Sequence, residues 1–267
     1  MSAQSENYAE LNRIAWNKRV GIHLQSEFYN QTSFLKGQIT LFDIEKNLLG
    51  NIIDLSILHL QCHFGQDTIS LSRMGAKATG LDISDKAIDA AREAAKQTGQ
   101  DTQFICHHVY ALPTDHHLQY DIVFSSYGTI TWLPDLLPWA KTISNALKSK
   151  GRFVFAEFHP LVWIYDESLS KMIYDYFNTK AIYEIEKGSY ADRNANVELE
   201  SLTWNHSLHE VISSLIAAGL KLIDFQEYDY SPCPFLPNML EDEPGKFRLQ
   251  NLSVKMPLVY SLVFEKI

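Results

Sequence analysis

The chain has 267 residues, of which 46% are hydrophobic and 21% charged, a composition that excludes a disordered or fibrous protein and allows a sizeable core. Lys and Arg number 23 and Asp and Glu number 32, which gives a formal net charge of −9. Nucleic-acid affinity comes mostly from Lys and Arg that neutralise phosphates, so an acidic chain without a basic run disfavours a duplex-binding role.

The cysteines, the histidines and the N-terminal segment indicate whether to expect disulfides, a metal site or secretion. Cys62, Cys106 and Cys233 are too few and too scattered for a disulfide framework or a zinc site. Histidine pairs such as His107-His108 do not favour a metal, because neighbours in a strand point to opposite faces. The N-terminal segment is charged throughout, unlike a secretory signal, and no apolar run approaches the roughly 18 residues that cross a bilayer. We therefore expect a cytoplasmic protein without metal or membrane contact.

The first 49 residues are predicted to be helical. Tyr8, Leu11 and Ile14 recur at three-residue intervals, which indicates an amphipathic helix over Glu6–Trp16. A second helix is predicted over Leu41–Leu49, where Gly50 follows as a stop signal. We interpret residues 1–49 as an N-terminal helical cap.

From Ile52 onward, apolar strands alternate with amphipathic helices. This alternation with short links predicts a doubly wound, mostly parallel α/β sheet in a single domain, residues 1–267, with its core over 50–158. The predicted strands are Ser56–Gln61, Lys77–Asp82, Gln103–His107, Asp121–Ser125, Arg152–Phe158, Leu220–Tyr228 and Leu258–Glu265. The predicted helices are Gln66–Arg73, Ser84–Gln97, Leu136–Leu147, which a turn at Lys150–Gly151 follows, and one from Ser207 to Ala218.

The alternation stops after Phe158. Residues 159–200 are rich in tyrosine and charge without a clear period, and we interpret them as an insertion, or lid, that covers one edge of the sheet. Residues 201–267 return to a helix and two strands. The proline-rich stretch Ser231–Pro244 is predicted to be a long loop between these strands.

Ligands of such sheets bind beyond the carboxyl ends of the strands, and Asp82 ends the second strand. A carboxylate there can accept hydrogen bonds from both ribose hydroxyls of an adenosine cofactor. It can also act as a partner for the positive end of the helix that begins at Ser84. The two roles are compatible.

The first strand-to-helix turn, Gln61-Cys62-His63-Phe64-Gly65, holds one glycine. A dinucleotide fingerprint needs three, because the backbone must approach a pyrophosphate. Side chains at Gln61 and His63 crowd a phosphate, which disfavours NAD and FAD and favours S-adenosylmethionine. That the loop binds nothing stays open.

Four segments in order carry a resemblance to a known family. ILHLQCHFGQDTISLSRMGAKATGLDIS, FICHHVYALP, YDIVFSSYGTITWLPDL and LKSKGRFVFAEFHP resemble the class I S-adenosylmethionine-dependent methyltransferases, in particular a bacterial small-molecule-type subgroup whose first motif reads LHLQCHFG. The resemblance runs from Ile57 to Pro160 and resumes at the final helix and strands. It implies a seven-stranded Rossmann-like sheet. It also implies methyl transfer to an O, N or S nucleophile of a small molecule, with S-adenosylhomocysteine as the other product.

Position by position, the resemblance implies a cofactor site. Its residues are Gln61, Cys62, His63 and Gly65 around the methionine part, Asp82 at the ribose, Ile83, His108 and Val109 at the adenine, and Ser125 at the methyl-donor site. Two positions depart from the family, because His59 stands where most members have Asp or Glu and His63 where they have Gly. The loss of the acid leaves the partner of the cofactor's ammonium group unassigned. A non-catalytic adenosyl-binding protein of the same fold therefore stays an alternative.

Two histidines are candidates for catalysis. His159 follows the carboxyl end of the fifth strand, next to the reactive side of the expected cofactor. His23 belongs to an N-terminal segment that covers the donor site in similar enzymes. An imidazole at either place can take a proton from the acceptor. A strand-end histidine bonded to backbone is an equally good interpretation of His159. The candidate substrate contacts are Tyr29, Tyr127 and Trp132, for which packing is the alternative.

Two further enzyme classes fit less well. The fourth-strand sequence SSYG lacks the Asn/Asp-Pro-Pro-Tyr motif with which amino-methylating enzymes stack a flipped base, which disfavours a nucleic-acid methyltransferase. An NAD-dependent dehydrogenase is the weakest alternative, because of the glycine-poor turn. The apolar C-terminal strands are compatible with a homodimer, but the oligomeric state stays open.

Overall fold

A seven-stranded sheet forms the centre of the protein, which a computed structural model describes over residues 7–166, 168–250 and 254–267. The strand order is β3-β2-β1-β4-β5-β11-β8, and β11 runs antiparallel to both of its neighbours while β1 to β5 pair in parallel. The predicted doubly wound, mostly parallel sheet is confirmed. Its strands are β1 Ser56–Leu60, β2 Lys77–Asp82, β3 Gln103–Cys106, β4 Tyr120–Ser126, β5 Leu147–Phe158, β8 Leu220–Tyr228 and β11 Val259–Lys266.

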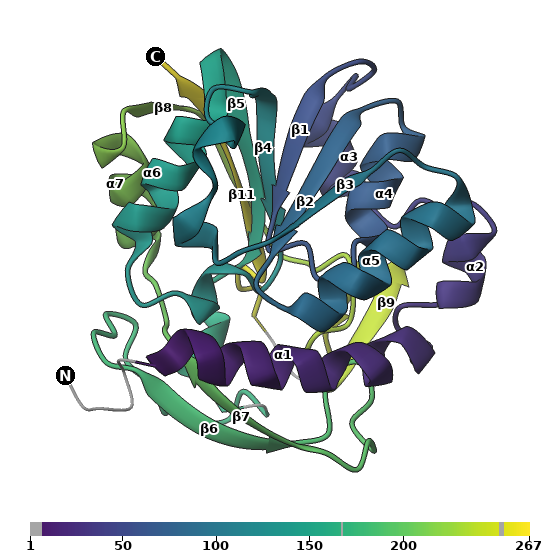
Figure 1. The fold of residues 1–267 in the computed structure, drawn as a ribbon. Helices are drawn as coiled ribbons and strands as arrows, with labels where there is room; N and C mark the ends of the chain where they lie inside the picture. The colour runs from purple at the N-terminus through teal and green to yellow at the C-terminus, as the bar shows by residue number, and fades with distance from the viewer. Residues whose placement is uncertain (1–6, 167, 251–253) are drawn as a thin grey trace.

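Helices cover both faces of this sheet (Figure 1). Successive residues of the central strands point to opposite faces, so Leu58 and Phe155 pack in the core under α6 and α7, while Ile57 and Val154 pack in the core on the other face. All four side chains are fully buried. The helices are α1 Tyr8–Gln25, α2 Gln31–Leu35, α3 Asp43–Leu49, α4 Gln66–Arg73, α5 Asp85–Thr98, α6 Leu136–Ala146 and α7 Leu208–Ala217.

Predicted caps are present at two of these helices. The Ser84 hydroxyl accepts from the Ala87 backbone N–H at 3.1 Å, and Gly99 ends α5 in the left-handed conformation with φ of 65°. Ser207 likewise accepts from the Glu210 N–H at 3.2 Å. The sequence therefore located the starts of α5 and α7 correctly.

The N-terminal helix differs from the prediction. α1 extends nine residues beyond the predicted end at Trp16, while Glu6, the predicted start, lies outside the described residues. The helix was underestimated because much of its buried side is polar, including Asn12, Arg19 and His23, and polar residues give no hydrophobic period.

Two hairpins occupy segments where the sequence predicted no strands. β6 Ile182–Lys187 pairs antiparallel with β7 Glu198–Thr203 inside and just beyond the predicted insertion, and β9 Met239–Glu243 pairs with β10 Lys246–Leu249 in and after the predicted loop. The prediction of a long loop over Ser231–Pro244 is therefore wrong for Met239–Glu243, which form β9. Figure 1 shows the β6–β7 hairpin and α1 together across one end of the sheet, where the lid was expected.

The junction between α6 and β5 also needs correction. Leu147, predicted to end the helix, begins the strand, and the predicted turn at Lys150–Gly151 lies within β5. The backbone still bends at the predicted turn. The register jumps from Tyr120 opposite Leu147 to Ile122 opposite Arg152, and Lys150 has a φ of 61°.

Within the described ranges, no helix is long and apolar enough to cross a membrane.

Candidate functional site

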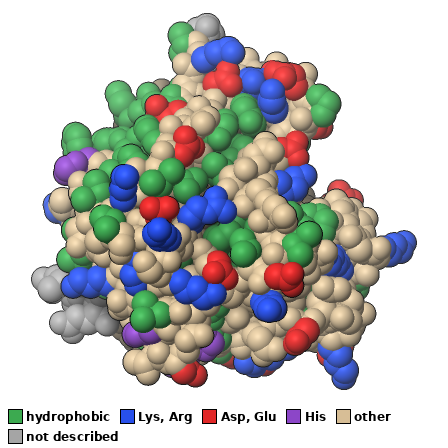
Figure 2. All heavy atoms as spheres, turned by 90° about the horizontal axis from the view of Figure 1, so that it is seen from above, with side chains coloured by type: hydrophobic (Ala, Val, Ile, Leu, Met, Phe, Trp, Pro, Cys, Tyr) green, Lys and Arg blue, Asp and Glu red, His purple; other side chains and the backbone are tan. Residues whose placement is uncertain are grey.

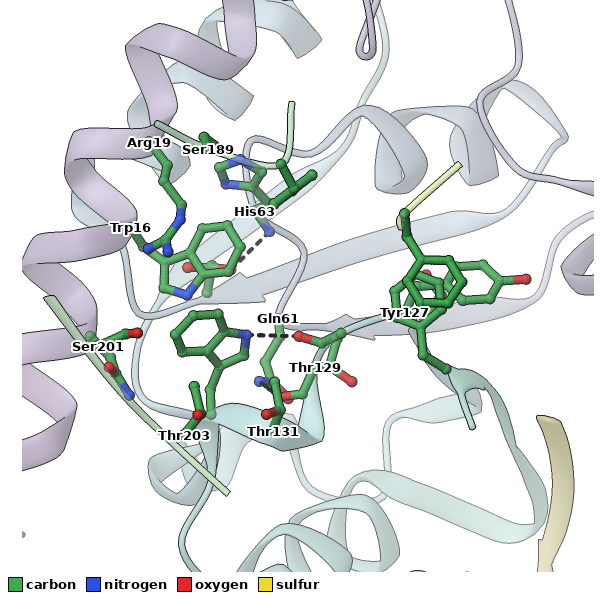
Figure 3. Close-up of a pocket in the computed structure, with 18 of the residues that line it drawn as sticks. Trp16, Arg19, Gln61, His63, Tyr127, Thr129, Thr131, Ser189, Ser201 and Thr203 are labelled. Carbon is green, nitrogen blue, oxygen red and sulfur yellow. Dashed lines mark hydrogen bonds between the residues drawn. The ribbon is translucent and has the colours of Figure 1, made fainter. Parts of the chain in front are cut away.

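A cavity of about 1030 Å³ lies at the carboxyl ends of the parallel strands, between the loops that follow them and a cover made by α1 and the β6–β7 hairpin. Figure 3 shows these side chains converging from separate elements. Most of the predicted site residues line it: Gln61, Cys62, His63, Gly65, Asp82, Ile83, His108, Val109, Tyr29, Tyr127 and Trp132. His23, Ser125 and His159 do not.

Asp82 lies on the cavity wall with its carboxylate fixed by two loops. Oδ2 accepts from the His63 N–H and Oδ1 from the Ser84 N–H, each at 2.8 Å. Burial raises the pKa of Asp82 to about 6, although the backbone donors favour the charged form. The carboxylate thus faces the cavity and also contacts the N-terminus of α5, so the two roles weighed for it are geometrically compatible.

The loop after β1 adopts strained backbone geometry. Gln61 and His63 have φ of 54° and 51°, in the left-handed region that non-glycine residues rarely occupy. Gly65 is required for packing, because a Cβ there would lie 2.7 Å from the Phe104 ring and 2.8 Å from the Ala91 Cβ. The Gln61 side chain donates to the Thr129 carbonyl at 2.7 Å and so ties this loop to the one after β4.

His59, in place of the family's acid, is a buried neutral side chain. Its Nδ1 lies 2.8 Å from the Thr68 hydroxyl, and burial lowers its pKa to about 3. It cannot balance a positive charge near pH 7. A carboxylate that sequence analysis missed, Asp67 on α4, also lines the cavity and accepts from the Thr40 hydroxyl.

His63, His23 and Ser189 form a hydrogen-bonded chain from the loop after β1 to the segment after β6. His63 Nε2 lies 2.8 Å from His23 Nδ1, and His23 Nε2 lies 2.6 Å from the Ser189 hydroxyl. Burial lowers the pKa of His23 to about 3, helped by Arg19, and holds that of His63 well below its usual range. Both imidazoles are therefore weak proton acceptors, and His23 does not line the cavity itself but contacts two residues that do, His63 and Ser189.

His159 and Ser125 are held by the protein outside the cavity wall. His159 follows the last residue of β5, as predicted, but its Nδ1 accepts from the Leu161 N–H at 3.1 Å and its Nε2 donates to Glu227 at 3.0 Å. Ser125 is fully buried and donates to the Thr129 hydroxyl. The geometry of His159 matches the strand-end alternative, so we do not assign it a catalytic role.

Arg19 is a lining residue that sequence analysis missed. Its side chain is 3% exposed, and its guanidinium carbon lies 5.1 Å and 5.4 Å from the ring centroids of Trp16 and Trp132. Nη2 donates to Glu186 of β6 at 3.0 Å, whereas Nη1 has no hydrogen-bond partner among the described residues. The spacing of Trp16 and Arg19, one helical turn apart, was the available signal.

Glu157 was also missed by sequence analysis, and it shapes the loop after β4. Its buried carboxylate accepts from the backbone N–H groups of Gly128, Thr129 and Phe158, the last two at 2.9 Å and 2.7 Å. It does not line the large cavity. Across the described residues, no group of three or more His, Cys, Asp or Glu side chains is arranged to hold a metal ion.

Comparison with known proteins identifies a domain within the chain. Residues 57–151 match the family model described as "Methyltransferase domain". Among curated relatives, a ubiquinone biosynthesis O-methyltransferase of Shewanella pealeana is 36% identical over 74 residues, which are 28% of this chain and 31% of that enzyme. The match thus spans about a third of the relative's length.

Solved structures show the same fold. An S-adenosylmethionine-dependent methyltransferase of Clostridium acetobutylicum aligns with a TM-score of 0.58 at 15% identity, over 96% of this chain and 98% of that one. The geranyl diphosphate C-methyltransferase of Streptomyces coelicolor, solved with S-adenosyl-L-homocysteine, aligns with 0.55 at 12% identity, over 89% and 79%. Residues 57–151 thus form a methyltransferase domain, and the chain has the fold of class I S-adenosylmethionine-dependent methyltransferases.

The cavity fits the cofactor of this class. Cofactor sites typically have volumes of about 300–1,000 Å³, so this cavity has room for the cofactor and a small acceptor. The Asp82 carboxylate and the apolar side chains of Ile83 and Val109 are among the residues that line it.

Proposed function

We propose that this methyltransferase methylates an O, N or S nucleophile of a small molecule. The observation that carries the proposal is the Asp82 carboxylate, held at the tip of β2 on the wall of a cavity large enough for two reactants. S-adenosylmethionine supplies an electrophilic methyl group on a sulfonium centre. The chain's own residues then orient the two reactants and exclude water from them.

The proposed roles follow the positions of the side chains. Asp82 accepts hydrogen bonds from the ribose, and the aromatic faces of Trp16 and Trp132 lie where they favour a cationic group. The residues proposed to flank the methionine part are Gln61, Cys62, His63 and Gly65, and those proposed to contact the adenine are Ile83, His108 and Val109. Tyr29, Tyr127 and Trp132 are proposed to contact the acceptor.

A small acceptor is favoured over a nucleic acid. α1 and the β6–β7 hairpin both contribute to the cavity wall, which limits the size of an acceptor. The chain is acidic, and on the face seen in Figure 2 the basic side chains are interspersed with acidic ones instead of gathering into a basic groove.

The proposal includes a cytoplasmic protein with one domain over residues 1–267, which the composition supports. It is compatible with a homodimer.

A non-catalytic adenosyl-binding protein is the second candidate. His59, neutral and buried, supports it, because a family member normally has an acid at that position. This candidate predicts cofactor binding without turnover of any acceptor.

Calorimetric titration with S-adenosylhomocysteine tests the proposal. We expect wild type to bind and Asp82→Ala to bind at least about tenfold more weakly, since charged hydrogen bonds contribute about 1.5–3 kcal/mol. Asp89→Ala, an exposed acid on α5, is the matched control and should bind like wild type. No binding at millimolar ligand, or equal binding by Asp82→Ala and wild type, contradicts the cofactor site.

A further inference from the structure

One end of the cavity is lined by aromatic rings, which we call the aromatic chamber. Tyr127 packs against Phe42 and Phe158 with ring centroids 6.1 Å and 5.3 Å apart, and Phe158 stacks on Phe235 at 4.0 Å and contacts Trp163 at 5.8 Å. All five rings line the cavity. Flat apolar walls of this kind are complementary to a planar aromatic ligand.

Tyr127 is the polar group of the chamber, and it comes directly after β4. Its backbone is held in the left-handed region, with φ of 39°, a strain that is common where a side chain must be aimed at a site. Its hydroxyl donates to Glu45 Oε2 at 3.0 Å. In Figure 3 Tyr127 lies across the pocket from Trp16 and Arg19.

Glu45, on α3, is a buried carboxylate without a cation. It is 1% exposed, and its other oxygen accepts from the Phe42 N–H at 3.3 Å. No Lys, Arg or His forms an ion pair with it within the described residues. Burial of such a group costs stability, and a cost of this kind is most often retained at functional sites.

The surroundings of Glu45 make it a better proton acceptor than the histidines. Burial raises its pKa to about 7, and the nearby Asp67 carboxylate acts in the same direction. The other titratable groups facing the pair are Cys233 and Tyr228. A base is most effective when its pKa lies near the working pH, whereas His23 has a pKa of about 3.

We propose that Tyr127 and Glu45 form a proton relay for a phenolic hydroxyl acceptor bound in the aromatic chamber. The inference rests on the proposed methyl transfer and names its acceptor class. The acceptor oxygen forms a bond to the methyl carbon as the sulfur–carbon bond breaks. The phenol proton passes to Tyr127 Oη while the Tyr127 proton passes to Glu45. The products are a methyl ether, the neutral thioether S-adenosylhomocysteine and a protonated Glu45, which releases its proton to solvent after the product leaves.

Two acceptors that differ in their need for a base test the relay. Catechol must lose a proton during the reaction, whereas thiophenol is largely ionised at neutral pH. We expect Glu45→Gln and Tyr127→Phe to lower kcat for catechol about 10²–10³-fold and to lower kcat for thiophenol far less. Asp43→Asn, an exposed acid on the same helix, should change neither rate.

A second measurement is independent of turnover. Infrared difference spectra of the protein with S-adenosylhomocysteine should contain a protonated-carboxyl band that grows as the pH falls through about 7. The component of this band that titrates near pH 7 should be absent in Glu45→Gln and should shift in Tyr127→Phe, because the hydroxyl that donates to the carboxyl is lost. A component that titrates near pH 6, from Asp82, should remain in both variants. A structural role for Glu45 predicts no such dependence on Tyr127.

The outcomes are distinguishable. Equal loss of both rates in Glu45→Gln overturns the relay, and so does wild-type methylation of thiophenol without methylation of catechol. Unchanged catechol rates in the variants, or a carboxyl component titrating near pH 7 that persists in Glu45→Gln, overturn it as well. Failure of wild type to bind S-adenosylhomocysteine overturns the proposed function instead.

Discussion

The guanidinium of Arg19 on α1 and the carboxylate of Glu186 on β6 form an ion pair at 3.0 Å that joins the N-terminal helix to the hairpin over the cavity. Arg19 is buried, while Glu186 is about half exposed. The pair brings together residues 167 positions apart. It therefore connects the two elements that must separate if a ligand enters from this side.

Glu186→Gln is expected to loosen the hairpin without unfolding the protein. A half-exposed ion pair contributes about 0–1 kcal/mol, so global stability should change little. Local opening should become more frequent, and hydrogen exchange of the β6 and β7 amides should accelerate. Glu198→Gln, which removes the long 3.9 Å contact with Lys187, is the control. Equal exchange rates in the two variants contradict the idea that the Arg19–Glu186 ion pair holds the hairpin against α1.

The affinity for S-adenosylhomocysteine should depend on pH through Asp82. Its pKa is raised by burial to about 6, and the ionised carboxylate is the stronger acceptor for ribose hydroxyls. Affinity should therefore be highest above pH 7 and should fall as the pH drops through about 6. Calorimetry between pH 5 and pH 8 measures this, and Asp82→Asn should bind weakly with a flatter profile. The same profile in both proteins contradicts the assignment.

Much of the fold was accessible from sequence, because buried parallel strands and amphipathic helices leave local patterns. The position of Asp82 on the cavity was accessible for the same reason, since the end of a strand fixes the edge of the sheet. Arg19 and Glu45 were not accessible. Each is a polar residue in a helix, and its environment depends on partners far along the chain: Glu186 for the first, and Tyr127, 82 positions away, for the second.

The histidines show a different limit. The position of His159 at the end of β5 was predicted correctly, but the direction of its imidazole depends on Leu161 and Glu227 and has no local signal. The hairpin β6–β7 was missed because its inner face lines a cavity with mixed residues, Ile182, Glu184 and Glu186, instead of packing in an apolar core.

Glu45→Gln should stabilise the protein at alkaline pH. Burial raises the pKa of Glu45 from 4.5 to about 7. Below about pH 4.5 the carboxyl is protonated in both the folded and the unfolded chain, and the stability it contributes is fully present. That contribution is lost as the pH rises towards 7, because the unfolded chain releases the proton first. At pH 8 the variant should gain up to about 3 kcal/mol over wild type, and at pH 4 little. Chemical denaturation at the two pH values measures this, and a variant less stable than wild type at pH 8 contradicts it.

The strain in the first loop gives a packing test with a matched control. Gly65→Ala places a Cβ 2.7 Å from the Phe104 ring and 2.8 Å from the Ala91 Cβ, at a φ of 80°. Overpacking of about 1–3 kcal/mol then adds to the cost of a left-handed alanine, about 1–2 kcal/mol. Gly99→Ala has the second cost alone, since its φ is 65° and nothing lies within 4 Å of the added Cβ. Gly65→Ala should therefore lower the free energy of unfolding more than Gly99→Ala, and it should also weaken S-adenosylhomocysteine binding. Equal destabilisation by the two substitutions, measured by denaturant titration, would mean that α4 can move away from Phe104 and that the loop is less constrained than its contacts indicate.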